Sequence, residues 1–300
     1  MERRYILHLL TPGAQASPFD VNMAADAGYD VITPYCGVTL DAVAGLTQDA
    51  IFSRGPKGAA RTGIFIGGRD VLLAADMLER ARQAMVPPFV VSLLADPSGA
   101  YTTAAALVAC TEAALQRDHA GALAGRRVLL LGGTGPVGRI AAVLCAQLGA
   151  TAVLASRRDR AAAQEAADAT GRRFGVTLAA ASVQGAQADA EFERAEVVLG
   201  VAAAGAQVMD ERQRERASRL LVAADINAVP PAGLAGVGVM DDRKPLGSGR
   251  ALGIGALTIG NVKYQVQHRL LVRMRGADKP VAYSFADALA VAREVLAEKA

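Results

Sequence analysis

Short apolar runs alternate with amphipathic stretches along the first 120 residues of the chain. The apolar runs predict strands at 5–10, 29–34, 62–67 and 88–95. Between them, apolar residues recur at the helical period, and Ser17-Pro18 is typical of a helix start. The amphipathic stretches predict helices that begin at Ser17 and that cover 39–52, 70–85 and 101–116. Alternating strands and helices with short connections indicate an α/β fold with a mainly parallel sheet.

A glycine-containing segment at 121–125 separates this part from a second run of the same alternation. Its apolar runs predict strands at 127–131, 151–156, 220–224 and 253–257, and near Thr177 and Val197. Helices are expected after Asp159, over 210–218 and through most of 261–300. The pattern therefore predicts two α/β domains, 1–120 and 121–264, with C-terminal helices of 265–300 packing back on the first domain.

A glycine fingerprint follows the first strand of the second domain. The strand runs into Gly-x-Gly-x-x-Gly over 133–138, and an amphipathic helix comes directly afterwards. In that order the glycines allow a tight turn, close approach to a pyrophosphate, and close packing of helix on strand. A strand at 151–156 closes a βαβ unit, which favours a Rossmann-type nucleotide site over a glycine turn that serves packing alone. The predicted cofactor contacts are Gly133, Thr134, Gly135, Pro136, Val137 and Gly138.

The segment Ser156-Arg157-Arg158 follows the second strand of that unit. NAD sites usually carry an acidic residue in this place, which binds the ribose 2′-hydroxyl. Two guanidinium groups suit the dianionic 2′-phosphate instead, because each can bind phosphate oxygens in a bidentate manner. The alternative is a pair of solvated surface arginines. The sequence predicts NADP as the cofactor, and the missing carboxylate does not exclude NAD.

Composition narrows the function classes. The formal net charge is +3, and no basic run is interleaved with aromatic residues, so nucleic acid is not an expected partner. No apolar run approaches the roughly 18 residues of a membrane span. The three cysteines are far apart and the three histidines lack metal-ligand spacing. We expect reduced core cysteines, a cytoplasmic protein and no metal site.

Several stretches outside the fingerprint resemble one enzyme family. They are Ser17–Ala24, Leu46–Asp49, Ile51–Arg54, Arg61–Gly68, Val86–Phe89, Asp225–Gly233, Gly253–Ala256 and Gly260–Tyr264. On these residues, and over nearly its whole length, the chain resembles the NAD(P)-dependent methylene-tetrahydromethanopterin dehydrogenases of methylotrophic bacteria, the B type most closely. The resemblance implies a pterin-binding substrate domain and an NADP domain around a cleft, in a homo-oligomer. One departure is that all three fingerprint glycines are present, whereas some B-type members lack the third.

The resemblance also implies a reaction, the oxidation of methylene- to methenyl-tetrahydromethanopterin in the one-carbon metabolism of formaldehyde oxidation. The reacting carbon lies between two nitrogens, so a nitrogen lone pair can expel the hydride and leave a delocalised amidinium. Because no proton leaves that carbon, no general base is required. The protein must hold the nicotinamide against the pterin, and a carboxylate near the developing cation would stabilise it.

The family's active-site lysine falls at Lys263, whose ammonium would contact a pterin oxygen or a substrate carboxylate; otherwise it is a solvated lysine at the start of a helix. Asp20 is expected to contact the pterin, unless it only caps a helix together with Ser17. The other expected contacts follow predicted strand ends, where ligands bind to open parallel sheets. They are Asp96, Thr102, Thr103 and Asn227 for the substrate, and Asp225 for the cofactor. Helix capping is the alternative role of Asp96 and the two threonines.

Two other functions stay open at this point. A folate-type methylene dehydrogenase is the first, although that family relies on a Tyr-x-x-x-Lys pair and no tyrosine of this chain has a lysine four residues later. Hydrolysis of the methenyl product is therefore not expected. A non-catalytic NADP-sensing protein is the second, which the fingerprint alone would allow and the matched first domain disfavours.

Overall fold

The computed structural model describes residues 3–157 and 159–298, with the side chains of 185–187 outside the description. By its internal contacts the chain divides into two compact units. The first is Met1–Thr102 with Tyr264–Val291, and the second is Thr103–Lys263 with Ala292–Ala300. Three helices contribute residues to both units: α5 (Ala100–Asp118), α10 (Ala256–Gly276) and α11 (Phe285–Ala297).

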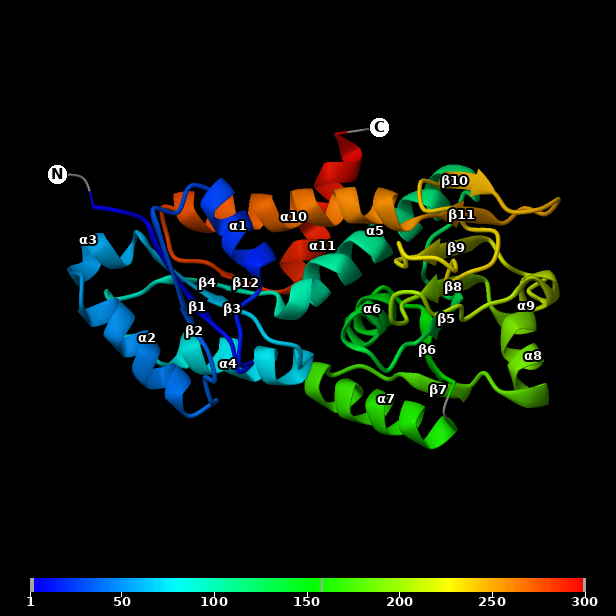
Figure 1. Cartoon of the computed structure of the whole chain (residues 1–300), viewed down its shortest axis with the longest axis horizontal. Coiled ribbons are helices and arrows are strands. Elements are labelled where there is room, and N and C mark those ends of the chain that lie inside the picture. The colour runs from blue at the N-terminus through cyan, green and yellow to red at the C-terminus, as the bar shows by residue number, and fades with distance from the viewer. Residues whose placement is uncertain (1–2, 158, 299–300) are drawn as a thin grey trace. The chain divides into compact units, whose positions relative to one another are not determined.

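A five-stranded parallel sheet forms the centre of the first unit (Figure 1). Its strands are β1 (Ile6–Leu10), β2 (Val31–Tyr35), β3 (Thr62–Ile66), β4 (Ser92–Ala95) and β12 (Ala282–Tyr283). They lie in the order β12-β4-β3-β1-β2, and each neighbouring pair is parallel. All five positions of β3 are buried, as expected for a central strand that helices cover on both faces.

Helices cover both faces of this sheet. They include α1 (Pro18–Asp26), α2 (Ala42–Phe52), α3 (Gly55–Ala59) and α4 (Val71–Gln83), and a 3₁₀ turn lies at Pro97–Gly99. Figure 1 shows α2 and α4 on one face and α1 with α10 on the other. A Cβ built on Gly63 would lie 2.3 Å from Met274 Cε of α10 and 3.1 Å from Leu7 Cδ1, so Leu7 faces α10. Because strand side chains alternate, His8 faces α2.

A seven-stranded sheet forms the centre of the second unit. Its strands are β5 (Arg127–Leu131), β6 (Thr151–Ser156), β7 (Ala179–Ser182), β8 (Val197–Gly200), β9 (Val222–Asp225), β10 (Asp242–Pro245) and β11 (Leu252–Ile254). They lie in the order β10-β11-β9-β8-β5-β6-β7, and β10 pairs antiparallel while the other pairs are parallel. The expectation of α/β units with mainly parallel sheets is confirmed.

The helices of the second unit are α6 (Pro136–Gln147), α7 (Arg160–Phe174), α8 (Gly185–Arg194) and α9 (Glu211–Arg216). Phe192 of α8 is fully buried in an apolar cluster with Leu129 and Val153, which lie on one face of the sheet. The alternate side chains of β5 point to the opposite face, where α6 and α7 lie together (Figure 1). The Asp159 carboxylate caps α7 by accepting a hydrogen bond from the Ala162 N–H at 2.7 Å.

Several sequence-based boundaries were wrong. The strand expected at 88–95 begins only at Ser92, because Val86 and Phe89 close a tight turn through two backbone hydrogen bonds. The strand expected at 253–257 ends at Ile254, and α10 begins at Ala256. The polar strand β10 was missed because it carries no apolar run. Cys36 is exposed, contrary to the expectation of three core cysteines, since it follows the end of the edge strand β2.

Candidate functional site

The second unit has the strand order of a dinucleotide-binding sheet. From β5, the strands β6 and β7 are added toward one edge of the sheet, and β8 and β9 are added toward the other edge. The direction of the strand order therefore reverses between β5 and β8. Ligands of open parallel sheets bind outside the carboxyl ends of the strands at such a reversal. The glycine fingerprint follows β5, so the predicted nucleotide loop lies at this switch point.

Close backbone packing fixes the shape of this loop. A Cβ on Gly138 would lie 2.5 Å from Gly133 Cα, which is closer than any real Cβ contact, so only glycine fits where α6 meets the turn. Gly132, which the sequence reasoning did not single out, has φ +79° and would place a Cβ 2.6 Å from Ala202 Cα after β8. The loops after β5 and β8 are therefore in contact at the switch point.

The N-terminus of α6 suits an anion. The helix begins at Pro136 with Gly135 as N-cap, and among the described side chains none caps it. Its first backbone N–H groups thus keep their capacity to bind phosphate oxygens, as the helix dipole favours. Arg139 Nε donates to the Thr134 carbonyl oxygen at 3.0 Å and holds the loop from within α6. Sequence reasoning missed Arg139, because arginine is abundant throughout the chain.

The residues predicted for the 2′-phosphate follow β6, the strand next to β5. Ser156 is buried at the end of β6, and Arg157 is exposed. One Arg157 N–H donates to the Gln207 carbonyl oxygen at 3.3 Å, and the Gln184 side-chain amide donates to the Arg157 carbonyl oxygen. Four of the five guanidinium donors thus lack a partner among the described residues. Arg158 lies outside the described residues.

Asp225 uses its carboxylate to hold a loop. It is buried at the end of β9, and its two oxygens accept from the backbone N–H groups of Asn227 at 3.0 Å and Leu234 at 2.9 Å. Burial raises the pKa of Asp225, while these amide donors lower it. The geometry gives Asp225 a positioning role for the segment after β9.

Asn227 connects the segments that follow β8 and β9. Its Oδ1 accepts from the Gly205 N–H and the Val229 N–H, both at 3.0 Å, and its Nδ2 donates to the Pro231 carbonyl oxygen at 2.7 Å. The amide of Asn227 is therefore committed to the shape of the switch-point loops, which favours a positioning role over a direct substrate contact.

The first unit has its own switch point. Its strand order β2-β1-β3-β4-β12 reverses between β1 and β3. Thr11 follows β1, is 3% exposed, and its Oγ1 accepts from the Gly13 N–H at 3.1 Å. The Gly67 N–H after β3 donates to the Leu10 carbonyl oxygen at 2.9 Å. The sequence analysis placed Asp96, Thr102 and Thr103 at this edge but did not single out Thr11, and the edge is the expected ligand crevice of the unit.

Asp96 and Thr102 come together beside this edge. The fully buried Asp96 carboxylate accepts from the N–H groups of Tyr101 at 2.9 Å and Thr102 at 3.1 Å, and from Thr102 Oγ1 at 2.6 Å. These bonds satisfy the first turn of α5, so the geometry favours the capping role. Thr103 is half-buried on the same turn.

Ser98 ties the two loops of this edge to each other. Its Oγ donates to the Gly68 carbonyl oxygen at 2.8 Å, and its backbone has φ +52°. A left-handed conformation at a residue other than glycine costs roughly 1–2 kcal/mol, so the surrounding contacts must hold it. Such residues gather at ligand sites.

Asp20 forms a buried pair with a residue that sequence reasoning missed. Ser17 and Pro18 begin α1 as expected, but Ser17 makes no side-chain cap hydrogen bond. Asp20 is 4% exposed, and its Oδ1 accepts from Gln267 Nε2 of α10 at 2.8 Å. The structure therefore shows a contact between α1 and α10 in place of the alternative role, in which Asp20 would cap α1 together with Ser17.

Replacing Gln267 with leucine is expected to lower the free energy of unfolding by about 1–3 kcal/mol, because a buried carboxylate would lose a donor. Urea denaturation of the full chain measures the change. Gln48→Leu is the matched control, since Gln48 is exposed on α2. Equal stability of the Gln267 variant and the control would show that the pair contributes nothing.

Lys263 lies inside α10 instead of at its start. The helix begins at Ala256, seven residues earlier, and Lys263 is half-buried one turn before Gln267. The alternative role, a solvated lysine at the start of a helix, is therefore wrong, because Lys263 is half-buried and lies inside the helix.

Within residues 3–157 and 159–298, no group of three or more histidine, cysteine, aspartate or glutamate side chains could hold a metal ion. None of the described helices combines the length and the hydropathy that a membrane span requires.

Sequence comparison connects the chain to a known family. The family described as methylene-tetrahydromethanopterin dehydrogenase, N-terminal, matches residues 18–98. An NAD(P)-dependent methylenetetrahydromethanopterin dehydrogenase of Methylorubrum extorquens is 45% identical over 295 residues, which cover 97% of this chain and 99% of that protein. The bifunctional protein MdtA of the same organism is 36% identical over 263 residues, covering 87% and 88%.

Solved structures share the fold at low identity. A shikimate 5-dehydrogenase from Mycobacterium fortuitum matches with TM-score 0.52 and 16% identity, over 97% of this chain and 98% of that one. A quinate dehydrogenase from Corynebacterium glutamicum in complex with NAD matches with TM-score 0.52 and 12% identity, over 97% and 99%. The likeness shows the Rossmann-type α/β architecture alone.

Proposed function

Because the chain belongs to the family of NAD(P)-dependent methylenetetrahydromethanopterin dehydrogenases, we propose that it transfers a hydride from methylene-tetrahydromethanopterin to NADP. The observation that carries the proposal is 45% identity along 97% of the chain, which includes both units. The product is methenyl-tetrahydromethanopterin, and NAD serves as a second acceptor.

The glycine loop supplies the nucleotide site. The absence of a Cβ at Gly138 and the uncapped start of α6 fit a pyrophosphate, and Arg157 fits a 2′-phosphate. Bound NADP supplies the hydride acceptor. Asp225 and Asn227 hold the loops around it in place through the hydrogen bonds described above.

The residues that hold the pterin orient it and stabilise the charge that develops on it. Lys263 donates to a pterin oxygen or a substrate carboxylate, and Asp20, oriented by Gln267, stabilises the developing amidinium. Asp96, Thr102 and Thr103 shape the edge after β4. No residue has to accept a proton from the reacting carbon.

Cofactor preference follows from the arginines after β6. Replacing both Arg157 and Arg158 with alanine is expected to weaken NADP binding by about 100-fold or more and to leave NAD binding nearly unchanged, because each lost charge-assisted phosphate contact costs about 1.5–3 kcal/mol. Fluorescence titration with both nucleotides measures this. Arg172→Ala with Arg173→Ala, at the far end of α7, is the matched control. Equal losses for NADP and NAD would refute the assignment.

Substrate choice is tested by kinetics with two pterins. Tetrahydromethanopterin and tetrahydrofolate share the reacting ring, so the proposal rests on the identity to the relative from Methylorubrum extorquens. Initial rates with both methylene-pterins and both nucleotides should show the highest kcat/KM for methylene-tetrahydromethanopterin with NADP. A higher kcat/KM for methylene-tetrahydrofolate would favour the folate-type alternative.

We further propose that the protein is a homo-oligomer of the cytoplasm. The three cysteines are free, which suits a reducing compartment. Size-exclusion chromatography with light scattering tests the assembly, and a monomer at micromolar concentration would contradict it.

A further inference from the structure

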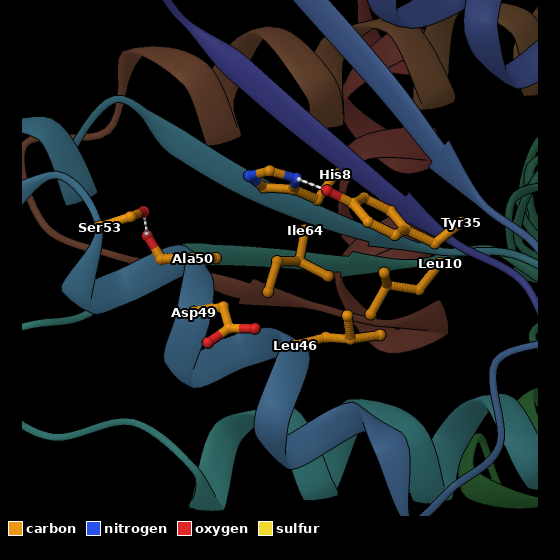
Figure 2. A pocket seen from close by; sticks show the side chains of 8 residues that line it. All are labelled: His8, Leu10, Tyr35, Leu46, Asp49, Ala50, Ser53 and Ile64. Carbon is orange, nitrogen blue, oxygen red and sulfur yellow. Dashed lines mark hydrogen bonds between the residues drawn. The ribbon is translucent and has the colours of Figure 1, made fainter.

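A cavity of about 270 Å³ lies within the first unit, between the sheet and α2 (Figure 2). It is lined by His8, Leu10, Tyr35, Leu46, Asp49, Ala50, Ser53 and Ile64. His8 and Ile64 stand in the middle of β1 and β3, and Figure 2 shows the α2 residues facing them. Leu10 and Tyr35 are the last residues of β1 and β2, so the cavity runs from the middle of the sheet to its carboxyl edge.

The floor of the cavity is apolar. Leu10, Ala50 and Ile64 are buried, and Leu46 is half-buried beside them. The volume is close to the small end of the range for ligand pockets, so it suits one substituted ring or a short branched chain.

His8, on the sheet side of the cavity, has one ring nitrogen with a partner and one without a partner among the described residues. His8 Nδ1 and the Tyr35 hydroxyl are 3.2 Å apart, and their rings are tilted by 48°. Burial, with the nearby Arg54 guanidinium, lowers the pKa of His8, so the ring is neutral at pH 7. Among the described residues, His8 Nε2 has no hydrogen-bond partner. The nearby Arg54 guanidinium donates instead to Thr62 Oγ1 at 2.9 Å and to the Arg4 carbonyl oxygen at 2.8 Å.

The opposite wall carries a carboxylate. Asp49 is exposed on α2, and within the described part of the chain its side chain makes no hydrogen bond or ion pair. Ser53, one turn later, donates to the Ala50 carbonyl oxygen at 3.4 Å. Figure 2 shows the Asp49 carboxylate on the α2 side and the His8 ring on the sheet side. An ionised carboxylate is an acceptor only, so it attracts cations and repels anions.

The α2 side of the cavity lies in stretches that resemble the family, but its polar residues have no role in the proposed reaction. Asp49 and Ser53 belong to the stretches Leu46–Asp49 and Ile51–Arg54, which match the family outside the nucleotide fingerprint. The proposed hydride transfer uses neither residue.

We propose that this cavity is a second binding site, which takes a small organic amine. The apolar body of the ligand lies on Leu10, Leu46 and Ile64, its ammonium pairs with Asp49, and a polar substituent reaches His8 Nε2. None of its lining residues has a role in the proposed hydride transfer.

Ligand-observed NMR on the full chain tests this with three probes of one shape: benzylamine, benzyl alcohol and benzoate. Benzylamine is expected to bind saturably with Kd on the order of 1–10 mM, as suits so small a ligand. Benzyl alcohol should bind about two- to fivefold more weakly, because a partly solvated ion pair contributes about 0.4–1 kcal/mol, and benzoate should bind more weakly still.

Two replacements of aspartate by asparagine, one in the cavity and one outside it, test where the amine binds. Asp49→Asn should reduce benzylamine binding to the level of benzyl alcohol. Asp41→Asn, also exposed and just before α2, should leave it unchanged. Both variants should keep the circular dichroism spectrum and the NADP affinity of the parent, which separates this test from that of the dehydrogenase. Absence of saturable benzylamine binding, equal affinity for benzoate, or equal losses in the two variants would overturn the proposal.

Discussion

Lys263→Ala is expected to lower kcat/KM for methylene-tetrahydromethanopterin by about 10- to 100-fold, because one charge-assisted contact is worth about 1.5–3 kcal/mol. NADP affinity should be preserved. The fold should also be preserved, since alanine is a good helix former and Lys263 lies inside α10. Steady-state kinetics with varied pterin, together with thermal unfolding, measure the effect.

The distribution of this loss between kcat and KM identifies the role of Lys263. A loss in kcat alone places the ammonium on the transition state, and a loss in KM alone makes it a uniform binding contact. Lys57→Ala is the matched control, because Lys57 is exposed on α3. If Lys263→Ala kept the kinetics of that control, the site assignment would fail.

Gly138→Ala is expected to weaken NADP binding by more than tenfold and to lower the free energy of unfolding by about 1–3 kcal/mol. The added Cβ would lie 2.5 Å from Gly133 Cα, so α6 must move away from the turn that is proposed to hold the pyrophosphate. NADP titration and urea denaturation measure the two effects.

Gly45→Ala serves as its control. Gly45 lies inside α2, and a Cβ there would meet nothing within 4 Å. The control should bind NADP normally and be slightly more stable, by up to about 1 kcal/mol. Equal NADP affinity in both variants would contradict the fingerprint assignment.

The glycine turn between β5 and α6 could be predicted because its signal is local. The spacing of Gly133, Gly135 and Gly138 between a strand and a helix is visible within a dozen residues. Most strands were found for the same reason, since buried parallel strands are short apolar runs. The β10 strand was missed because it is exposed and polar, and no sequence period marks it.

The roles of individual polar residues depend on contacts that sequence distance hides. Asp225 was correctly placed at a strand end, but the loop that folds back at Leu234 takes up its oxygens. Gln267 and Asp20 form a hydrogen bond although 247 residues separate them in the sequence, and no local pattern around either residue predicts the pair. The Asp96 carboxylate shows the same limit, because capping and ligand binding use the same residue type at the same helix start.

The transfer of a labelled hydride tests the central claim most directly. The full chain would be incubated with NADP and tetrahydromethanopterin carrying a dideuterated methylene group, and the reduced nucleotide would be analysed by mass spectrometry. The proposed reaction predicts one deuterium in each NADPH formed, with one equivalent of methenyl-tetrahydromethanopterin. Reduced nucleotide without deuterium, or no reduction of NADP by this substrate, would contradict it.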